Sequence, residues 1–169
     1  LDANVVAGYD FIADAANARD GNGRDADAAD PGDWAASGEC GAGSAARDSS
    51  WHGTRVAGLV AAVANNGADV AGIAHGARVV PVRVAGKCGT NLTDLADAIT
   101  WSSGGTVAGV PSIASPVEVI ALGVTGVGAC NASLQAAIDG AVGRGVVVVG
   151  AAGDYNRDAS LSWPGNCAN

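Results

Sequence analysis

The chain has 169 residues, of which 49% are apolar, and its formal net charge is −8 at pH 7. This length and apolar content predict one globular domain over residues 1–169 with no linker. The acidic balance argues against nucleic acid as a partner, and no apolar run is long enough to span a membrane, so we expect neither nucleic acid nor a membrane among the partners.

In chain order, the first predicted elements are a short strand and a long loop. Residues 5–6 and 9–12 have the apolar and aromatic content of a strand. Residues 13–50 are rich in Asp, Gly, Ala, Asn and Ser and show almost no periodicity. Loops of this length usually bind something or line a site, so we expect a functional role for this one.

A helix and a strand follow the loop. Residues 54–65 predict a helix, because apolar residues recur on one helical face, and residues 78–84 predict a strand. His52 lies just before this helix among small residues, where its imidazole could face a cleft and transfer protons near neutral pH. The usual alternative for a lone histidine is a capping or core residue, and His75 is expected to be a surface or packing residue.

In the second half of the chain, predicted helices and strands again follow one another. Residues 93–102 predict a helix, and residues 117–124 predict a strand. Asn131 can cap a third helix. The four valines of residues 146–149 are typical of a strand that is buried on both faces. The apolar face of the third helix consists of Leu134, Ile138, Ala141 and Val142.

The alternation of strands and helices predicts an α/β fold with a mostly parallel sheet and helices on both faces. Sites in such sheets lie outside the carboxyl ends of the strands. In this chain those ends are expected at residues 10–14, 84–89, 123–126 and 151–156.

The four cysteines, Cys40, Cys88, Cys130 and Cys167, have no Cys-x-x-Cys spacing, which argues against a zinc site. An even number of widely spaced cysteines instead favours two disulfides in a secreted protein. The alternative is four buried free thiols in a cytosolic protein.

Six short segments carry a family resemblance together. They are residues 9–11 (Tyr-Asp-Phe), 20–25 (Asp-Gly-Asn-Gly-Arg-Asp), 52–58 (His-Gly-Thr-Arg-Val-Ala-Gly), 71–74 (Ala-Gly-Ile-Ala), 81–84 (Pro-Val-Arg-Val) and 151–153 (Ala-Ala-Gly). In this order and at these distances, they resemble the subtilisin-like serine proteases of the secreted bacterial branch. The resemblance implies a subtilisin-like fold, incomplete in this chain, and an extracellular location.

In that family a serine attacks the peptide carbonyl, a histidine takes its proton and an aspartate orients the histidine. The resemblance implies that His52 is this general base. It places the aspartate before Leu1 and the serine after Asn169, so the chain resembles the middle part of a catalytic domain. We therefore expect a segment of a serine endopeptidase that hydrolyses peptide bonds in proteins, inactive as an isolated chain. Its expected partners are a peptide or protein substrate and a complementary fragment carrying the serine.

One departure from the family concerns the oxyanion. The family has an asparagine after Ala-Ala-Gly, whereas this chain has Asp154. Losing one such donor costs on the order of 3 kcal/mol of transition-state stabilisation. A protonated Asp154 could still donate a hydrogen bond.

The substrate-pairing residues also depart from the family pattern. The resemblance places the substrate-binding residues at Gly123, Val124, Thr125, Ala152 and Gly153, where the family usually has Ser-Leu-Gly at the first three. An extended edge remains for pairing with a peptide. These departures favour an alternative function, a noncatalytic, degenerate relative that binds peptides or regulates a partner.

Two structural features complete the expectations. The oxygen-bearing side chains of the acidic loop have a spacing that suits structural calcium, and similar proteases bind calcium in loops of this region, although a solvated acidic loop is the alternative. The candidate ligands are Asp10, Asp14, Asp20, Asn22, Asp25 and Asp27.

Cysteine order and the resemblance suggest the pairs Cys40–Cys88 and Cys130–Cys167, while pairing of Cys40 with Cys130 or Cys167 stays open.

Overall fold

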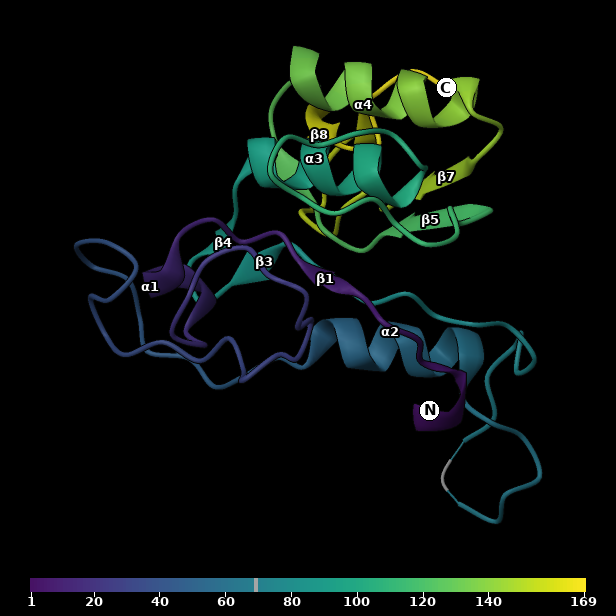
Figure 1. The fold of residues 1–169 in the computed structure, drawn as a ribbon. Coiled ribbons are helices and arrows are strands. Elements are labelled where there is room, and N and C mark those ends of the chain that lie inside the picture. Colours follow the sequence, from purple (N-terminus) through teal and green to yellow (C-terminus); the bar gives the residue numbers. More distant parts are fainter. Residues whose placement is uncertain (69) are drawn as a thin grey trace. The chain divides into compact units, whose positions relative to one another are not determined.

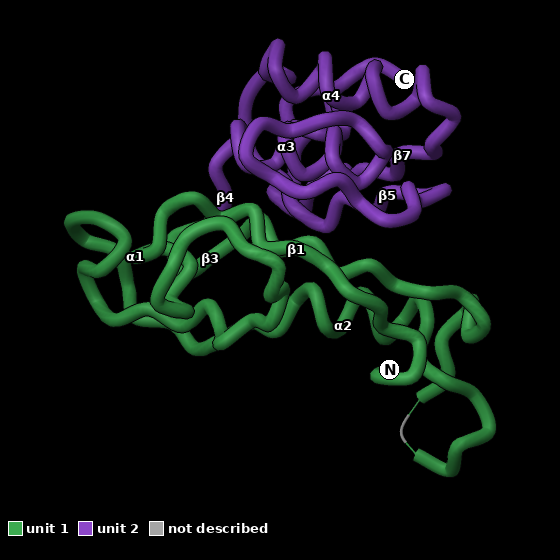
Figure 2. Tube along the Cα trace, in the orientation of Figure 1, with its two compact units in different colours: residues 1–89 green, residues 90–169 purple. Residues whose placement is uncertain are grey.

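A computed structural model describes residues 1–68 and 70–169. The chain forms two compact units, residues 1–89 (unit 1) and residues 90–169 (unit 2), shown in Figure 1 and coloured separately in Figure 2. The expectation of one domain over residues 1–169 stays a prediction. None of the helices in the described residues has the length and hydropathy needed to cross a membrane.

Unit 1 consists largely of loops around one long helix and short paired strands. Strand β1 pairs in parallel with β2, with Tyr9 opposite Val82 and Asp10 opposite Arg83, and β3 pairs with β4. The predicted strands at residues 9–12 and 78–84 are therefore confirmed in shorter form. The elements are η1 (Asp2–Asn4), β1 (Tyr9–Asp10), α1 (Ala15–Ala18), α2 (His52–Ala61), β2 (Val82–Arg83), β3 (Ala85–Gly86) and β4 (Gly89–Thr90).

A glycine sets the spacing of the first strand pair. A Cβ atom on Gly8 would lie 1.8 Å from the carbonyl oxygen of Pro81, so no other residue fits without moving one strand. The same carbonyl accepts a hydrogen bond from the Tyr9 N–H at 3.1 Å. Gly8 thus permits the register that places Asp10 beside Arg83.

Helix α2 begins two residues before the predicted start and ends four residues before the predicted end. It ends at Ala61 because a later segment of the chain binds the carbonyls at its end. The N–H groups of Gly72, Ile73 and Ala74 donate to the carbonyls of Ala62, Leu59 and Val60, in that order. Leu59, on the predicted apolar face, is 65% exposed.

Unit 2 has the more regular architecture. Helices α3 and α4 pack against each other, and α4 also contacts β7. Strands β5 and β7 are parallel, whereas β6 and β8 are antiparallel. The elements are α3 (Leu92–Ser102), β5 (Val119–Leu122), β6 (Gly126–Val127), α4 (Ala132–Gly143), β7 (Val147–Gly150), η2 (Ala159–Leu161) and β8 (Ser162–Trp163).

The core of unit 2 lies between its helices and strands. Leu95 and Ile99 of α3 and Leu134 and Ile138 of α4 are all buried. Asn131 caps α4 by accepting hydrogen bonds from the N–H groups of Ser133 and Leu134, as predicted. Val142 was expected on the inner face of α4 but is 38% exposed.

The prediction that residues 146–149 are buried on both faces is wrong. Val146 is buried, but Val147 and Val149 are 57% and 55% exposed. Within the described residues β7 pairs only with β5, and the side chains that face away from the helices have no covering layer. Val119 of β5 lies opposite Val147 and is exposed on the same side, so the strand pair has one open apolar face.

Candidate active site

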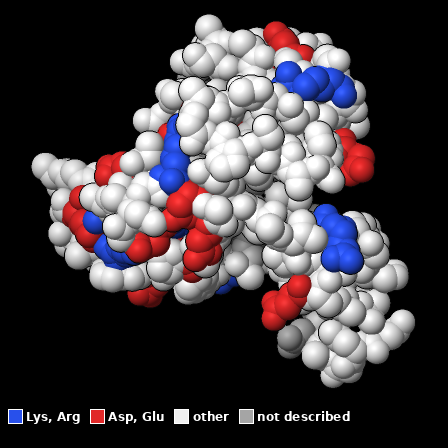
Figure 3. Space-filling model, in the orientation of Figure 1, with Lys and Arg blue, Asp and Glu red and all other residues white. Residues whose placement is uncertain are grey.

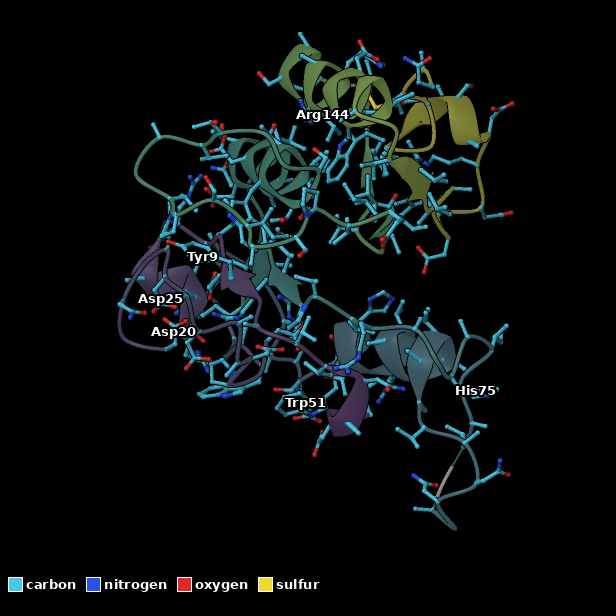
Figure 4. The ribbon with its side chains drawn as sticks, turned by 45° about the vertical axis from the view of Figure 1, so that its right-hand side comes forward. Tyr9, Asp20, Asp25, Trp51, His75 and Arg144 are labelled. Carbon is cyan, nitrogen blue, oxygen red and sulfur yellow. A yellow bond between two sulfur atoms is a disulfide. The ribbon has the colours of Figure 1, made fainter. Side chains whose placement is uncertain are left out.

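His52 is the first residue of α2, and its side chain is exposed. The preceding Trp51 has a left-handed backbone with φ 50° and provides no side-chain cap, while the His52 N–H donates to the Ser50 hydroxyl at 3.3 Å. The exposure excludes a core histidine, and the imidazole is open to a reacting group. His75 is also exposed and lies away from the labelled residues of the acidic loop (Figure 4).

Asp33 anchors the segment before His52. One carboxylate oxygen accepts the Ser50 N–H at 2.6 Å, and the other accepts the Ser50 hydroxyl at 2.9 Å. Partial burial acts to raise the pKa of Asp33, but the hydrogen bonds from Ser50 and the nearby Arg47 charge outweigh it and hold that pKa below its usual range. Sequence reasoning missed Asp33, since only its place in the acidic loop marked it.

Two predicted strand ends meet at one edge of unit 2. Leu122 lies opposite Gly150 at the carboxyl ends of the parallel strands β5 and β7, and the Ala151 N–H donates to the Leu122 carbonyl at 3.2 Å. The chain therefore leaves both strands on the same side. This brings the candidate substrate-binding residues together: Gly123, Val124 and Thr125 after β5, and Ala152 and Gly153 after β7.

Gly153 and Asp154 form the tip of this edge. Gly153 has φ 89°, a conformation that favours glycine, and the hydroxyl oxygen of Thr125 lies 3.1 Å from the position a Cβ atom would take there. Asp154, at the predicted oxyanion position, is exposed. Ser162 of β8 also lies close to Gly153, and the sequence analysis did not include it among the site residues.

The acidic loop of unit 1 is organised around a buried arginine. Arg83 donates to the Asp10 carboxylate at 2.5 Å and to the Asp20 carboxylate at 2.8 Å, and it also donates to the Ala18 carbonyl. Burial is the main cause that raises the pKa of Asp10, although the Ile12 N–H and Arg83 act against it. Figure 3 shows the acidic and basic side chains intermingled over the part of unit 1 labelled α1 in Figure 1.

The six candidate calcium ligands do not form one group. Asp10 is fully buried with Arg83, and Asp14 caps α1 by accepting the Ala16 N–H. Within the described residues, no three His, Cys, Asp or Glu side chains gather as a metal site. Asp20 and Asp25 lie near each other in the loop (Figure 4), and Asn22 donates to the Asp25 carboxylate. The oxygen chemistry of this part of the loop suits a hard cation, but the Asp20 carboxylate is also paired with Arg83, as the Asp10 carboxylate is.

Two disulfides, one in each unit, confirm the suggested pairing. Cys40 is bonded to Cys88, and Cys130 to Cys167, with Cα atoms 5.2 Å apart in both pairs. Beside the first, Glu39 accepts from Lys87 at 2.6 Å and from Arg19 at 2.7 Å. Each disulfide therefore ties a long loop within its own unit.

Comparison with known proteins agrees with this arrangement. Residues 12–169 match the Subtilase family, so the chain belongs to that family and has its subtilisin-like fold. It is 62% identical over its full length to an extracellular protease of Xanthomonas campestris pv. campestris and 47% identical to an extracellular basic protease of Dichelobacter nodosus. The chain spans 29% of the length of each of these relatives.

Solved structures give the same assignment. A protease of Pseudoalteromonas arctica superposes with a TM-score of 0.97 at 53% identity, over 99% of this chain and 49% of that one. A cold-adapted subtilisin-like serine proteinase superposes with a TM-score of 0.60 at 26% identity, over 96% of this chain and 44% of that one.

Proposed function

We propose that the chain is a segment of an extracellular serine endopeptidase and that His52 is its general base. The observation that carries the proposal is the exposed imidazole of His52 in the first turn of α2, within the segment His-Gly-Thr. Extracellular location and peptide or protein substrates are supported by the names of the two relatives, both extracellular proteases. Those names give no support to a noncatalytic peptide-binding role.

The roles of the chain's own residues follow from serine-protease chemistry. His52 would accept the proton of the attacking serine hydroxyl and then give it to the leaving amine. The extended backbone after β5, at Gly123–Thr125, would pair with the substrate peptide. Asp154 would lie near the developing oxyanion, where an ionised carboxylate opposes the negative charge.

The role of His52 is tested by His52→Ala in the full-length protein that carries this chain. Without a base for the serine, we expect kcat/KM for a peptide substrate to fall by about 10⁴-fold or more. His75→Ala is the matched control, because His75 is also exposed. If His52→Ala retained full activity, the proposed base would be wrong.

Asp154 provides a second test of the same function. Asp154→Asn would supply the amide donor of the family, and we expect kcat to rise by roughly 10²-fold. An unchanged or lower kcat would show that Asp154 does not lie at the oxyanion.

We further propose that a complementary segment carrying the serine covers the open apolar faces. The support is the exposure of Leu59 and Ile73 in unit 1 and of Val119, Val147 and Val149 in unit 2. Exposed apolar groups of this kind usually mark a contact surface. Light scattering of the chain tests this: a single 16.3 kDa species, with no second component after purification from its source, would contradict it.

Calcium is a proposal for the acidic loop. Asp20, Asn22, Asp25 and Asp27 supply hard oxygen ligands in two pairs, each two residues apart, and Gly21 and Gly23 allow a tight turn. Such an ion would stabilise the loop by binding the folded state. We expect chelation to lower the Tm of the protein and Asp25→Asn to reduce that shift. A Tm that does not change across a wide range of calcium concentration would refute the proposal.

A further inference from the structure

Two buried hydroxyl groups of unit 2 have no hydrogen-bond partner among the described residues. The side-chain oxygens of Thr125 and Ser162 are both shielded from solvent and unpaired, and Ser162 is fully buried. A hydroxyl in this state has given up water without replacing its hydrogen bonds, which is unfavourable for folding. An unpaired buried hydroxyl therefore requires an explanation, such as a partner that binds from outside the chain.

The two hydroxyls converge on one glycine. Measured from the position that a Cβ atom of Gly153 would occupy, the Thr125 oxygen lies at 3.1 Å and the Ser162 oxygen at 3.6 Å. Thr125 comes from the segment between β5 and β6, Ser162 from β8, and Gly153 from the segment after β7. Three separate segments therefore bring two donor and acceptor groups to the edge that holds the candidate substrate-binding residues.

Tyr155 covers this hydroxyl pair. Its ring carbon Cδ2 lies 3.3 Å from the same position at Gly153, and its hydroxyl donates to the Thr125 carbonyl at 3.4 Å. That hydrogen bond is long and the side chain is 45% exposed. The Arg157 guanidinium also lies over the ring, but at 5.8 Å from its centroid, near the limit of a cation–π contact, so the ring is held weakly. The Thr125 carbonyl belongs to the extended segment that a peptide would pair with, so Tyr155 occupies a backbone acceptor that a peptide would need.

We propose that Thr125 and Ser162 select a small, uncharged, hydrogen-bonding side chain of the substrate, such as an amide or a hydroxyl, and that Tyr155 moves aside to admit it. The inference rests on the proposed function, because it names the class of side chain that the same edge accepts. A bound amide would give both hydroxyls the partners they lack. A backbone N–H of the bound peptide would then donate to the Thr125 carbonyl in place of the Tyr155 hydroxyl.

Uncharged groups are favoured for a physical reason. Both hydroxyls are neutral and can donate as well as accept, which matches an amide or hydroxyl. A charged side chain would have to lose its water to reach atoms that are buried, and two neutral hydroxyls would not compensate for that loss. An apolar side chain would leave both hydroxyls unpaired, and sites of that kind discriminate against analogues without the polar group.

The test compares two nearly isosteric peptides, N-acetyl-Ala-Ala-Asn-amide and N-acetyl-Ala-Ala-Leu-amide. Equilibrium binding of each to the full-length protein is measured by calorimetry, and we expect the Asn peptide to bind about tenfold more tightly. In Ser162→Ala and Thr125→Val, the two Kd values should become nearly equal. Ser133→Ala, at an exposed position of α4, is the matched control and should keep the preference.

Folding does not obscure this test, because Ser162→Ala removes an unpaired buried hydroxyl and should leave the Tm unchanged or raised. Tyr155→Ala should strengthen binding of the Asn peptide by removing the competing contact. The inference is overturned if the wild type binds the two peptides equally, if Ser162→Ala keeps the preference, or if neither peptide binds the wild type or Tyr155→Ala.

The proposed function has a separate readout. Hydrolysis of longer peptides with Asn or Leu at the corresponding position is followed in the same protein. An Asn preference in binding without any hydrolysis would refute the proposed function and leave the inference standing. Hydrolysis that does not distinguish Asn from Leu would support the function and refute the inference.

Discussion

Unit 1 and unit 2 are each stabilised internally by a different kind of interaction. In unit 1 a buried guanidinium, Arg83, joins Asp10 of β1 to the acidic loop, and much of the remaining chain is irregular. In unit 2 the helices α3 and α4 bury leucines and isoleucines between them and against the strands. Arg144, after α4, also donates to the Ser103 hydroxyl after α3 at 2.7 Å. The contrast shows that one chain can order a long loop by charge pairing and build a neighbouring region by apolar packing.

Arg83→Met gives the strongest test of this contrast. The change leaves the Asp10 carboxylate buried without its partner, and breaking such a pair costs about 4 kcal/mol. We expect hydrogen exchange to show lost protection in residues 1–89 and unchanged protection in the helices of unit 2. The double variant Asp10→Asn with Arg83→Met removes both charges and should recover part of the loss. Equal loss of protection in both units would contradict separate stabilisation.

Leu134→Ala is the corresponding change in unit 2. Leu134 is fully buried in α4, and its truncation should cost about 3 kcal/mol through lost burial and a cavity. Hydrogen exchange should then show reduced protection in residues 90–169 alone. Val142→Ala, on the partly exposed side of the same helix, is the control and should cost less than about 1 kcal/mol. A larger effect of Val142→Ala than of Leu134→Ala would show that Val142, and not Leu134, packs in the core of unit 2.

The smallest expected effect concerns acid stability. The Lys87 ammonium, with the Ala36 N–H and Arg19, lowers the pKa of Glu39 from 4.5 to about 2. A carboxylate whose folded pKa is lowered stabilises the fold above its unfolded pKa and loses that contribution as the pH falls. Glu39→Gln should therefore flatten the decrease in Tm between pH 4.5 and about 2. Identical Tm curves for the variant and the wild type would show that these exposed contacts add nothing.

Local sequence patterns predicted those features that depend on neighbouring residues. The Asn131 cap fixes the start of α4, because its side chain accepts from N–H groups two and three residues later. The order of strands and helices follows from periodicity in the same way. The sequence placed His52 just before a helix predicted to begin at residue 54, whereas α2 begins two residues earlier, at His52 itself.

Apart from the two disulfide pairs, which cysteine order and the family resemblance suggested, the features that depend on distant residues were not predicted. The role of Arg83 requires the pairing of β1 with β2, which places it opposite Asp10, and no local pattern shows that pairing. The exposure of Val147 and Val149 depends on which strands and helices cover β7, whereas four valines alone cannot distinguish one covered face from two. Ser162 was missed because a single serine in a two-residue strand has no pattern, and only its approach to Gly153 marks it.

The two disulfides have a mechanical consequence. Each closes a loop within one unit, spanning 48 residues in the first and 37 in the second, and the two loops do not overlap in sequence. A chain pulled from its ends while oxidised would pass force directly through the two sulfur bridges, so the enclosed residues could not lengthen it. Reduction should therefore increase the extension at full unfolding in two separable amounts, the larger from the loop that contains His52.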